Sequence, residues 1–228
     1  MSEFNIFETL YEWGQESLNE MAYPSNFNLM EFSELPTFKA RKQYCDDRLQ
    51  QLGKGSSRIV YKVDEEKALK IAFNQKGIAQ NRAECDWGKN NYEVFGKVYN
   101  ADTDNYYWIE MELARKATTK DFKTFFGVSF KDFCEMIKYI YTIAVPEFKK
   151  YFRYSDEIKS KVDDLLYNDE DNPITRLYQY ISDYRPFTIN DWLRIANWGI
   201  VSRNGKEHLV IIDDGFNQDV YDNYYARR

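Results

Sequence analysis

The strand-forming segments of this chain are confined to one stretch, and this distribution most constrains its fold. Five segments rich in β-branched and aromatic residues are predicted strands: residues 49–52, 58–63, 68–73, 94–99 and 106–113. One helix is predicted among them, at residues 77–92, and the later residues mostly follow helical spacing. We therefore expect an α+β fold in which a five-stranded antiparallel sheet precedes a mainly helical part.

The chain has 228 residues, which is enough for one large domain or two small lobes. We expect a helical N-terminal extension over residues 1–46, a sheet lobe over residues 47–113 and a helical lobe over residues 114–228. In the extension, residues 4–20 have the spacing of an amphipathic helix and residues 22–36 are expected to form a loop. The polar residues 37–46 that follow are expected to be helical.

Capping residues predict three helices in the second half. Ser129 begins a helix that is expected to run through Tyr151, and Ser155 begins the next one. Asn172, which precedes a proline at the first helical position, begins a third.

A glycine-rich segment separates the first two predicted strands. Gly53 and Gly55 would let the backbone approach an anion, and the amides of Ser56 and Ser57 could point at a phosphate. A strand follows this segment, so it is neither a P-loop nor a dinucleotide-binding turn, both of which lead into a helix. The alternative is an ordinary hairpin turn.

Lys70 lies in the middle of an apolar strand. Strand alternation places Leu69 and Ile71 on one face and Lys70 on the other, where it could bind the phosphates of a nucleotide. Glu84 lies on the next predicted helix and could hold this lysine in position. The alternative is a solvated lysine and an unrelated surface glutamate.

One hairpin interrupts the helical half. It turns at Asn204 and Gly205, a pair that favours two-residue turns, with Asn197 just before the hairpin and Asp213 just after it. Residues that enter and leave a hairpin lie at its open end, so we expect Asn197 and Asp213 to be neighbours. Amide and carboxylate oxygens are ligands that suit Mg²⁺. The alternative is a turn-capping asparagine and an exposed aspartate.

Composition argues against several other functions. The formal net charge of −6 disfavours nucleic acid as a partner, and no run of eighteen apolar residues predicts a membrane span. The chain has one histidine and three widely spaced cysteines, Cys45, Cys85 and Cys134. This leaves little material for a zinc site, a disulfide framework or a Ser-His-Asp triad, and we expect a reducing, cytoplasmic setting.

The order of these features resembles the protein-kinase-like superfamily. LGKGSSRIVYKV resembles its glycine-rich loop, ALKIA its lysine strand, WIEMEL the strand that enters its hinge, and IIDDGF its metal-binding segment. The resemblance implies a bilobal fold that binds ATP and Mg²⁺, with adenine against the backbone around Met111 and Leu113. Essentially the whole chain also resembles small uncharacterised kinase-like proteins of tailed, crAss-like bacteriophages. That second resemblance implies the bacterial host cytoplasm or the virion as a location.

The chain departs from the kinase pattern in several places. Arg58 stands where the third glycine of the loop is usual, and Asp214 stands where the phenylalanine of the metal-binding segment is usual. Trp192 occupies the usual place of the catalytic aspartate, whereas Asp191 lies six residues before Asn197. Asp191 is a candidate base if the loop carries one extra residue, and a surface turn residue otherwise. The few residues after the metal-binding segment imply a truncated helical lobe without a platform for peptide substrates.

Two functions of different classes follow. The first is a phosphotransferase in which Lys70, Glu84 and Asp191 act on ATP. Its acceptor would be a host protein, a small molecule or the chain itself. Transfer of a nucleotidyl group in place of a phosphoryl group is an alternative reaction. The second is a nucleotide-binding pseudokinase whose aromatic ends would bind a host or virion protein; these residues are Phe4, Phe7, Tyr11, Trp13, Tyr221, Tyr224 and Tyr225. An unrelated α+β binding domain is a third possibility.

Overall fold

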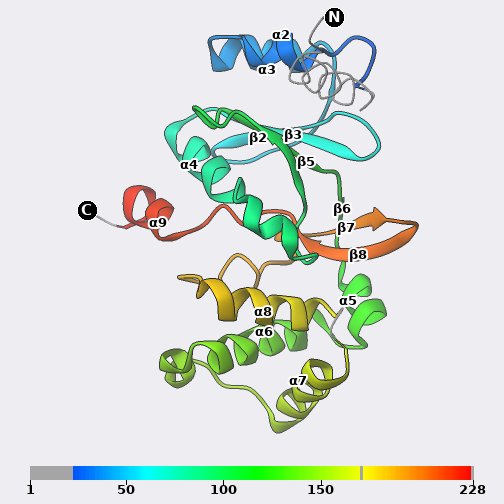
Figure 1. Cartoon of the computed structure of the whole chain (residues 1–228), viewed down its shortest axis with the longest axis vertical. Helices are drawn as coiled ribbons and strands as arrows, with labels where there is room; N and C mark the ends of the chain where they lie inside the picture. Colours follow the sequence, from blue (N-terminus) through cyan, green and yellow to red (C-terminus); the bar gives the residue numbers. More distant parts are fainter. Residues whose placement is uncertain (1–22, 170–171, 227–228) are drawn as a thin grey trace, which may run out of the picture.

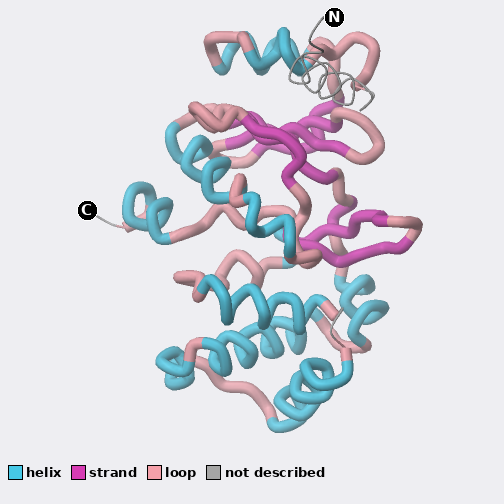
Figure 2. Tube along the Cα trace, in the orientation of Figure 1, coloured by secondary structure: helices cyan, strands magenta, loops and turns pink. Residues whose placement is uncertain are grey.

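The computed structural model describes residues 23–169 and 172–226. The α+β class is confirmed: a five-stranded antiparallel sheet and a helical region lie at opposite ends, and a three-stranded sheet lies between them (Figure 1, Figure 2). The predicted helix at residues 4–20 lies outside the described residues, as do Phe4, Phe7, Tyr11 and Trp13. In the described part, no helix combines the length and apolar character needed to span a bilayer.

The large sheet has the order β1-β2-β3-β5-β4, and each neighbouring pair is antiparallel. Its strands are β1 (Gln50–Lys54), β2 (Arg58–Lys62), β3 (Lys67–Ala72), β4 (Val98–Ala101) and β5 (Trp108–Glu112). The strand predicted at residues 94–99 starts later than expected. Phe95 pairs with Ile211 of another sheet instead, and both side chains are buried in the helical core.

Two helices cover the outer face of this sheet: α2 (Leu29–Ser33) and α3 (Phe38–Asp46). Leu69 and Ile71 point into this layer and are fully buried with aromatic side chains of the helices. The helix predicted at residues 37–46 is confirmed. The loop predicted at residues 22–36 contains α2, which the Asn28 side chain caps by accepting from the Glu31 N–H.

Helix α4 (Gln75–Glu84) packs against β3 on the other side of the sheet. The helix predicted at residues 77–92 therefore ends earlier, and a 3₁₀ turn, η1 (Trp87–Asn91), follows it. The Asn90 side chain bonds both the N–H and the carbonyl oxygen of Val98, at 3.0 and 2.9 Å. These bonds hold the tighter turn against β4, a long-range contact that helical periodicity does not encode.

The helical region consists of α5 (Thr119–Phe126), α6 (Phe130–Ala144), the 3₁₀ turn η2 (Pro146–Tyr151), α7 (Asp156–Asn168) and α8 (Pro173–Tyr184). The predicted caps are confirmed, because Ser129, Ser155 and Asn172 each accept a bond from a first-turn backbone N–H. The helix expected through Tyr151, with Pro146 as the site of a kink, ends at Ala144 instead. Pro146 lacks an N–H and begins a separate turn.

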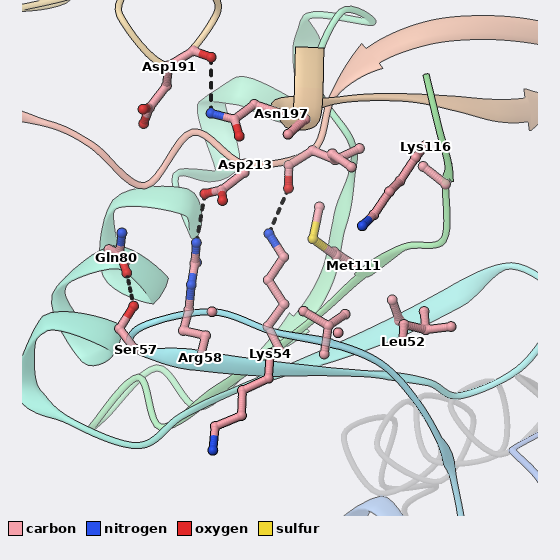
Figure 3. Close-up of a pocket in the computed structure, with 18 of the residues that line it drawn as sticks. Leu52, Lys54, Ser57, Arg58, Gln80, Met111, Lys116, Asp191, Asn197 and Asp213 are labelled. Atoms are coloured by element: carbon pink, nitrogen blue, oxygen red, sulfur yellow. Dashed lines mark hydrogen bonds and ion pairs between the residues drawn. The ribbon is translucent and has the colours of Figure 1, made fainter. Parts of the chain in front are cut away.

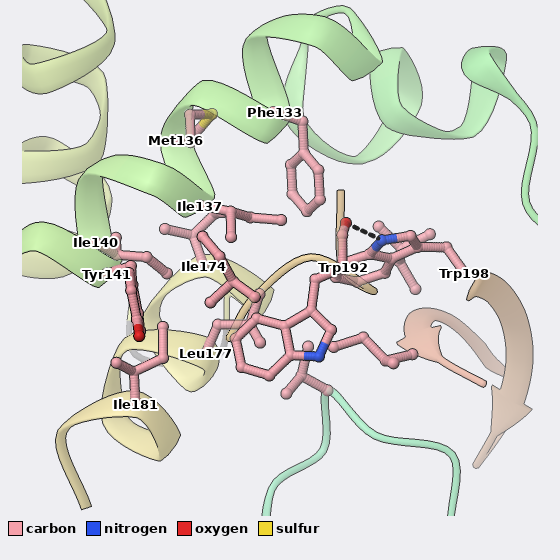
Figure 4. Packing of buried hydrophobic residues seen from close by; sticks show 14 of the residues in the cluster. Phe133, Met136, Ile137, Ile140, Tyr141, Ile174, Leu177, Ile181, Trp192 and Trp198 are labelled. Atoms are coloured by element: carbon pink, nitrogen blue, oxygen red, sulfur yellow. Dashed lines mark hydrogen bonds between the residues drawn. The ribbon is translucent and has the colours of Figure 1, made fainter. Parts of the chain in front are cut away.

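The core of this region is formed by α6, α8 and the two tryptophans Trp192 and Trp198 (Figure 4). Both indole rings are almost fully buried, and Trp198 Nε1 donates to the Trp192 carbonyl oxygen at 2.8 Å. This bond and the packing fix the loop that carries Asp191, the neighbour of Trp192.

The small sheet has the order β6-β7-β8 and lies between the two larger parts (Figure 1). Its strands are β6 (Arg115–Lys116), β7 (Trp198–Arg203) and β8 (Lys206–Ile211), and a 3₁₀ turn, η3 (Ile195–Asn197), leads into β7. The predicted hairpin turn is confirmed: Asn204 and Gly205 have φ values of 52° and 74°. A last helix, α9 (Gln218–Tyr224), returns to α4 of the upper part.

Candidate functional site

A cavity of about 450 Å³ lies between the large sheet and the hairpin (Figure 3). All but one of the predicted catalytic, nucleotide-binding and metal-binding residues line it: Gly53, Gly55, Ser56, Ser57, Lys70, Met111, Leu113, Asp191, Asn197 and Asp213. The exception is Glu84, which does not line the cavity but pairs with Lys70, which does. The fold thus brings together segments that are far apart in the chain.

The glycine-rich segment forms a tighter turn than expected, because β1 continues through Lys54. Its free end is tied to α4: Asn74 Nδ2 donates to the Ser56 carbonyl oxygen, and the Ser57 hydroxyl donates to Gln80. A Cβ at Gly77 of α4 would lie 2.3 Å from the Ser57 carbonyl oxygen, so only glycine permits this approach. The helix therefore holds the turn over the cavity.

Gly53 faces open space. A Cβ added there would meet no atom within 4 Å, although the residue lines the cavity. The absence of a side chain at this position keeps room for a ligand under the turn.

Beneath the turn, two cations and two carboxylates form one connected group, which we call the cleft cluster: Arg58, Lys70, Glu84 and Asp213. Lys70 Nζ lies 2.6 Å from Glu84 Oε2 and 2.7 Å from the Ile212 carbonyl oxygen. The Arg58 guanidinium lies 2.7 Å from Glu84 Oε1 and 2.7 Å from Asp213 Oδ1. The charges balance within the cluster.

The pKa values of the cluster follow from these contacts. Burial lowers the pKa of Arg58, but Glu84 and Asp213 outweigh it and leave the pKa raised. Burial acts to raise the pKa of Asp213, but Arg58 and Lys70 outweigh it, and the pKa is lowered. Both groups are thus charged near neutral pH.

Asn197 and Asp213 lie side by side, because the Ile212 N–H bonds the Asn197 carbonyl oxygen at 2.8 Å where the hairpin closes. The Asn197 side-chain nitrogen donates to the Asp191 carbonyl oxygen at 3.0 Å. Its carboxamide oxygen is turned toward Asp213 (Figure 3). The two candidate metal ligands therefore face a common space.

Asp191 opens toward the same cavity from the loop before η3. Burial raises its pKa to about 7, and the negative charges of Asp213 and Asp214 add to this rise. A carboxyl group with this pKa can take up or release a proton near neutral pH.

Apolar side chains line the opposite end of the cavity, where a nucleotide base would bind: Leu52, Val60, Ala68 and Met111. The backbone around Met111 and Leu113 was expected to meet the base, but the Leu113 N–H donates to the Glu66 carbonyl oxygen at 2.6 Å. The neighbouring Ala114 also lines the cavity, and in the described part of the chain its N–H has no hydrogen-bond acceptor. Ala114 is therefore the better candidate for bonding a base.

Asp214 has a structural role that the sequence did not reveal. Its carboxylate accepts from Trp192 Nε1 at 2.8 Å and pairs with Lys89 Nζ at 2.7 Å. It therefore joins the loop that carries Asp191 to the segment after α4. The departure from the kinase pattern at this position places a buried ionic link where a phenylalanine is usual.

The C-terminal segment also contributes to the site. Phe216 and Tyr225 line the cavity beside the glycine-rich turn, and the Lys76 Nζ lies 4.4 Å from the Tyr225 ring centroid. A Cβ at Gly215 would lie 2.9 Å from the Cβ of Gln80, so this glycine permits the segment to cross α4 closely. Of the three C-terminal tyrosines expected to bind a partner, Tyr225 lines the cavity, whereas Tyr221 and Tyr224 do not.

The residues fit a magnesium–nucleotide complex better than a metal held by protein alone. Asn197 and Asp213 supply two oxygens, and Mg²⁺ in nucleotide sites takes its other ligands from phosphates and water. Among the described residues, no group of three or more His, Cys, Asp or Glu side chains could hold a metal ion. The open space at Gly53 and the free Ala114 N–H fit the nucleotide.

Comparisons with known proteins give distant matches. No family model matches the chain, and no curated protein matches it. The streptomycin–ATP–APH(2")-IIa ternary complex has 14% identity and a TM-score of 0.37, and the match covers 81% of this chain and 72% of that one. SAICAR-synthase from Saccharomyces cerevisiae, in complex with SAICAR, has 9% identity and a TM-score of 0.34, and the match covers 73% of each chain. Likenesses this distant carry no argument about activity.

Proposed function

We propose that this chain is a kinase-like phosphotransferase that uses ATP and Mg²⁺. The observation that carries the proposal is the cleft cluster: a buried lysine and its glutamate partner lie beneath a glycine turn, beside an Asn–Asp pair. Lys70 is 6% exposed and points into the cavity, which argues against the alternative of a solvated strand lysine. Phosphoryl transfer depends mainly on positioning and on charge neutralisation, which such a group can provide.

Each side chain has a defined task in this proposal. Lys70, held by Glu84, binds phosphate oxygens, and the Ala114 N–H and the apolar end bind the base. Asn197 and Asp213 hold the metal ion together with the phosphates, and the ion neutralises negative charge on the transferred group. Asp191 orients the acceptor hydroxyl and takes its proton.

Nucleotide-dependent thermal stabilisation tests the binding step. With ATP and Mg²⁺ at 100 times the dissociation constant, mass action stabilises the folded chain by about 2.7 kcal/mol. We expect Lys70→Met to abolish the shift and Lys54→Met to retain most of it. Lys54 lines the same cavity but lies near the Phe73 ring, 5.6 Å from its centroid, and takes part in no described ion pair. Absence of any shift in the unmodified chain would contradict the proposal.

Transfer itself is tested by following the γ-phosphoryl group of labelled ATP. Incubation with bacterial extract, with metabolite mixtures and with the protein alone separates the three acceptor classes. Label should reach one of them, and Asp191→Asn should prevent this while nucleotide binding remains.

A nucleotide-binding pseudokinase is the second candidate, and one observation favours it. Arg58 already neutralises Asp213, the carboxylate that a catalytic metal ion would need. Such a protein would use the occupied nucleotide site to present a surface to a protein partner, which the phage resemblance suggests is a host or virion protein. Nucleotide binding without any transfer would support this candidate over the first.

A further inference from the structure

Arg58 is the residue of the cavity that the kinase resemblance explains least. It begins β2, directly after the glycine turn, and only 7% of its surface is exposed. Its two terminal nitrogens contact carboxylates from different parts of the fold, Glu84 of α4 and Asp213 after β8. Figure 3 shows the contact with Asp213. A third, longer contact joins Nη1 to Asn81 Oδ1 at 3.4 Å.

This geometry requires an arginine. The planar guanidinium presents donors in a fixed fork and remains charged, whereas a lysine ammonium is a single point that cannot span two carboxylates in this way. Glu84 already bonds Lys70 through its other oxygen. Arg58 therefore fixes Glu84 and Asp213 relative to each other before any ligand binds.

The same contact limits what Asp213 can bind. Oδ1 is committed to Arg58, while the Asp213 side chain as a whole is 45% exposed and lines the cavity. Asn197 adds one amide oxygen. This leaves two protein oxygens, enough to share one hydrated ion with a nucleotide but few for the pair of ions that some phosphoryl-transfer sites hold.

We propose that Arg58 is the resident cation of the nucleotide site. Its guanidinium occupies Asp213 Oδ1, which is then not available to a second divalent ion, so the site takes a single ion with the nucleotide. Arg58 also positions both carboxylates without needing to touch the reacting atoms. The inference rests on the proposed nucleotide site, and it holds whether or not that site performs transfer.

Counting bound Mn²⁺ tests this directly. Electron paramagnetic resonance of free Mn²⁺, measured with a non-hydrolysable ATP analogue, gives the number of ions per bound nucleotide. We expect one ion in the unmodified chain, and two would overturn the inference while leaving the nucleotide site intact. No binding of the analogue at all would overturn the proposed function as well, which makes the two failures distinguishable.

Substitution of Arg58 separates its charge from a merely structural role. In Arg58→Met we expect a second Mn²⁺ per nucleotide, because Asp213 Oδ1 becomes available. Arg203→Met is the matched control: Arg203 is similarly buried and pairs with Glu112 at 2.6 Å, but it does not line the cavity. The control should keep one ion even if it is less stable.

If Arg58→Met binds one Mn²⁺ per nucleotide, and the Mn²⁺ concentration at the midpoint of the thermal shift is unchanged, Arg58 has only a structural role and the inference is overturned. If Arg58→Met does not fold, Arg58→Lys replaces it. Lysine keeps a positive charge but lacks the planar guanidinium that contacts two carboxylates. We therefore expect the Mn²⁺ concentration at the midpoint of the thermal shift to change at least about threefold. An unchanged midpoint concentration would again overturn the inference.

Discussion

Two buried arginines of this chain make similar contacts in different places. Arg58 belongs to the cleft cluster and bridges carboxylates at the cavity. Arg203 pairs with Glu112 and also donates to the carbonyl oxygens of Glu93 and Phe95, at 2.6 and 2.8 Å. We call Arg203 and Glu112 the hinge cluster, because they tie the hairpin to the end of β5.

The difference lies in what remains available to a ligand. In the hinge cluster both charges are largely enclosed, since the Arg203 and Glu112 side chains are 10% and 6% exposed, although Glu112 also borders the cavity. In the cleft cluster the Asp213 side chain is 45% exposed, and Asp213, Lys70 and Arg58 all line the cavity. The same pairing of charges thus holds the fold together at one site and prepares a binding surface at the other.

The largest expected effect concerns Asp191, the carboxylate at the cleft that pairs with no cation within the described residues. Asp191→Asn should lower the rate of transfer by about 10² to 10⁴, the usual contribution of a positioned base. Nucleotide-dependent thermal shifts should stay unchanged, since Asp191 holds no part of the cleft cluster. An equal rate in the variant would remove Asp191 from this role.

Arg203→Met should be the most destabilising of the arginine substitutions, with a loss of about 3 to 5 kcal/mol, because it leaves Glu112 buried without its cation. Arg58→Met should cost less, since Glu84 keeps Lys70 and Asp213 is half exposed. Urea unfolding of both variants measures the comparison. A larger loss for Arg58→Met would reverse the assignment of the two clusters.

A double substitution sharpens the same point. Arg203→Met combined with Glu112→Leu should recover at least half of the stability lost by Arg203→Met alone, because the unpaired buried charge is gone. The double-mutant cycle needs the single variant Glu112→Leu as its fourth corner. Purely additive losses would contradict a coupled pair.

Two glycines, one packed against its neighbours and one facing the cavity, should also differ in their effects on stability and on nucleotide binding. A Cβ at Gly199 would lie 2.6 Å from the Ala114 Cβ, so Gly199→Ala should cost about 1 to 3 kcal/mol and displace the Ala114 amide. Gly53→Ala meets no atom and should change stability by less than about 0.5 kcal/mol, yet weaken nucleotide binding because it fills the cavity. Equal effects of the two on stability would contradict this assignment.

The smallest effect concerns Glu110, which is fully buried two residues before Glu112 but has no arginine. Its contact is the Tyr23 hydroxyl, at 3.0 Å, and burial raises its pKa above the ordinary value of 4.5. The folded chain therefore holds this proton more tightly than the unfolded chain. Stability should fall as the pH rises from about 4.5 toward the folded pKa, by at most about 1.4 kcal/mol per pH unit. Glu110→Gln should flatten this slope in urea unfolding series, and an unchanged slope would contradict it.

Local signals predicted many elements correctly. The caps Ser129, Ser155 and Asn172 and the Asn204-Gly205 turn act through neighbouring backbone, so the sequence contains all of their partners. Strand alternation also placed Lys70 opposite Leu69 correctly. Other elements differed from their predicted bounds: β4 starts at Val98, α4 ends at Glu84 and α6 ends before Pro146, and α2 lies in a predicted loop. The late start of β4 and the turn after α4 depend on contacts with distant residues, and Pro146 lacks the N–H that would continue α6.

The candidate site was predictable in its membership but not in its connections. Lys70, Glu84, Asn197 and Asp213 could be singled out because each sits in a recognisable local pattern. The role of Arg58 was not visible, since it appeared only as a missing glycine. Its partners lie on α4 and after β8, and nothing in its own neighbourhood points to them.

Short-range periodicity and turn chemistry were enough to predict the α+β class, the order of most elements and the chemical groups that could bind a nucleotide. Three features depend on packing: the carboxylate that each cation meets, the Ala114 amide that has no acceptor in the described part of the chain, and the return of the C-terminal segment to α4. These features depend on distances between residues far apart in the chain. They become defined only when the sheet, the hairpin and the helical core pack together.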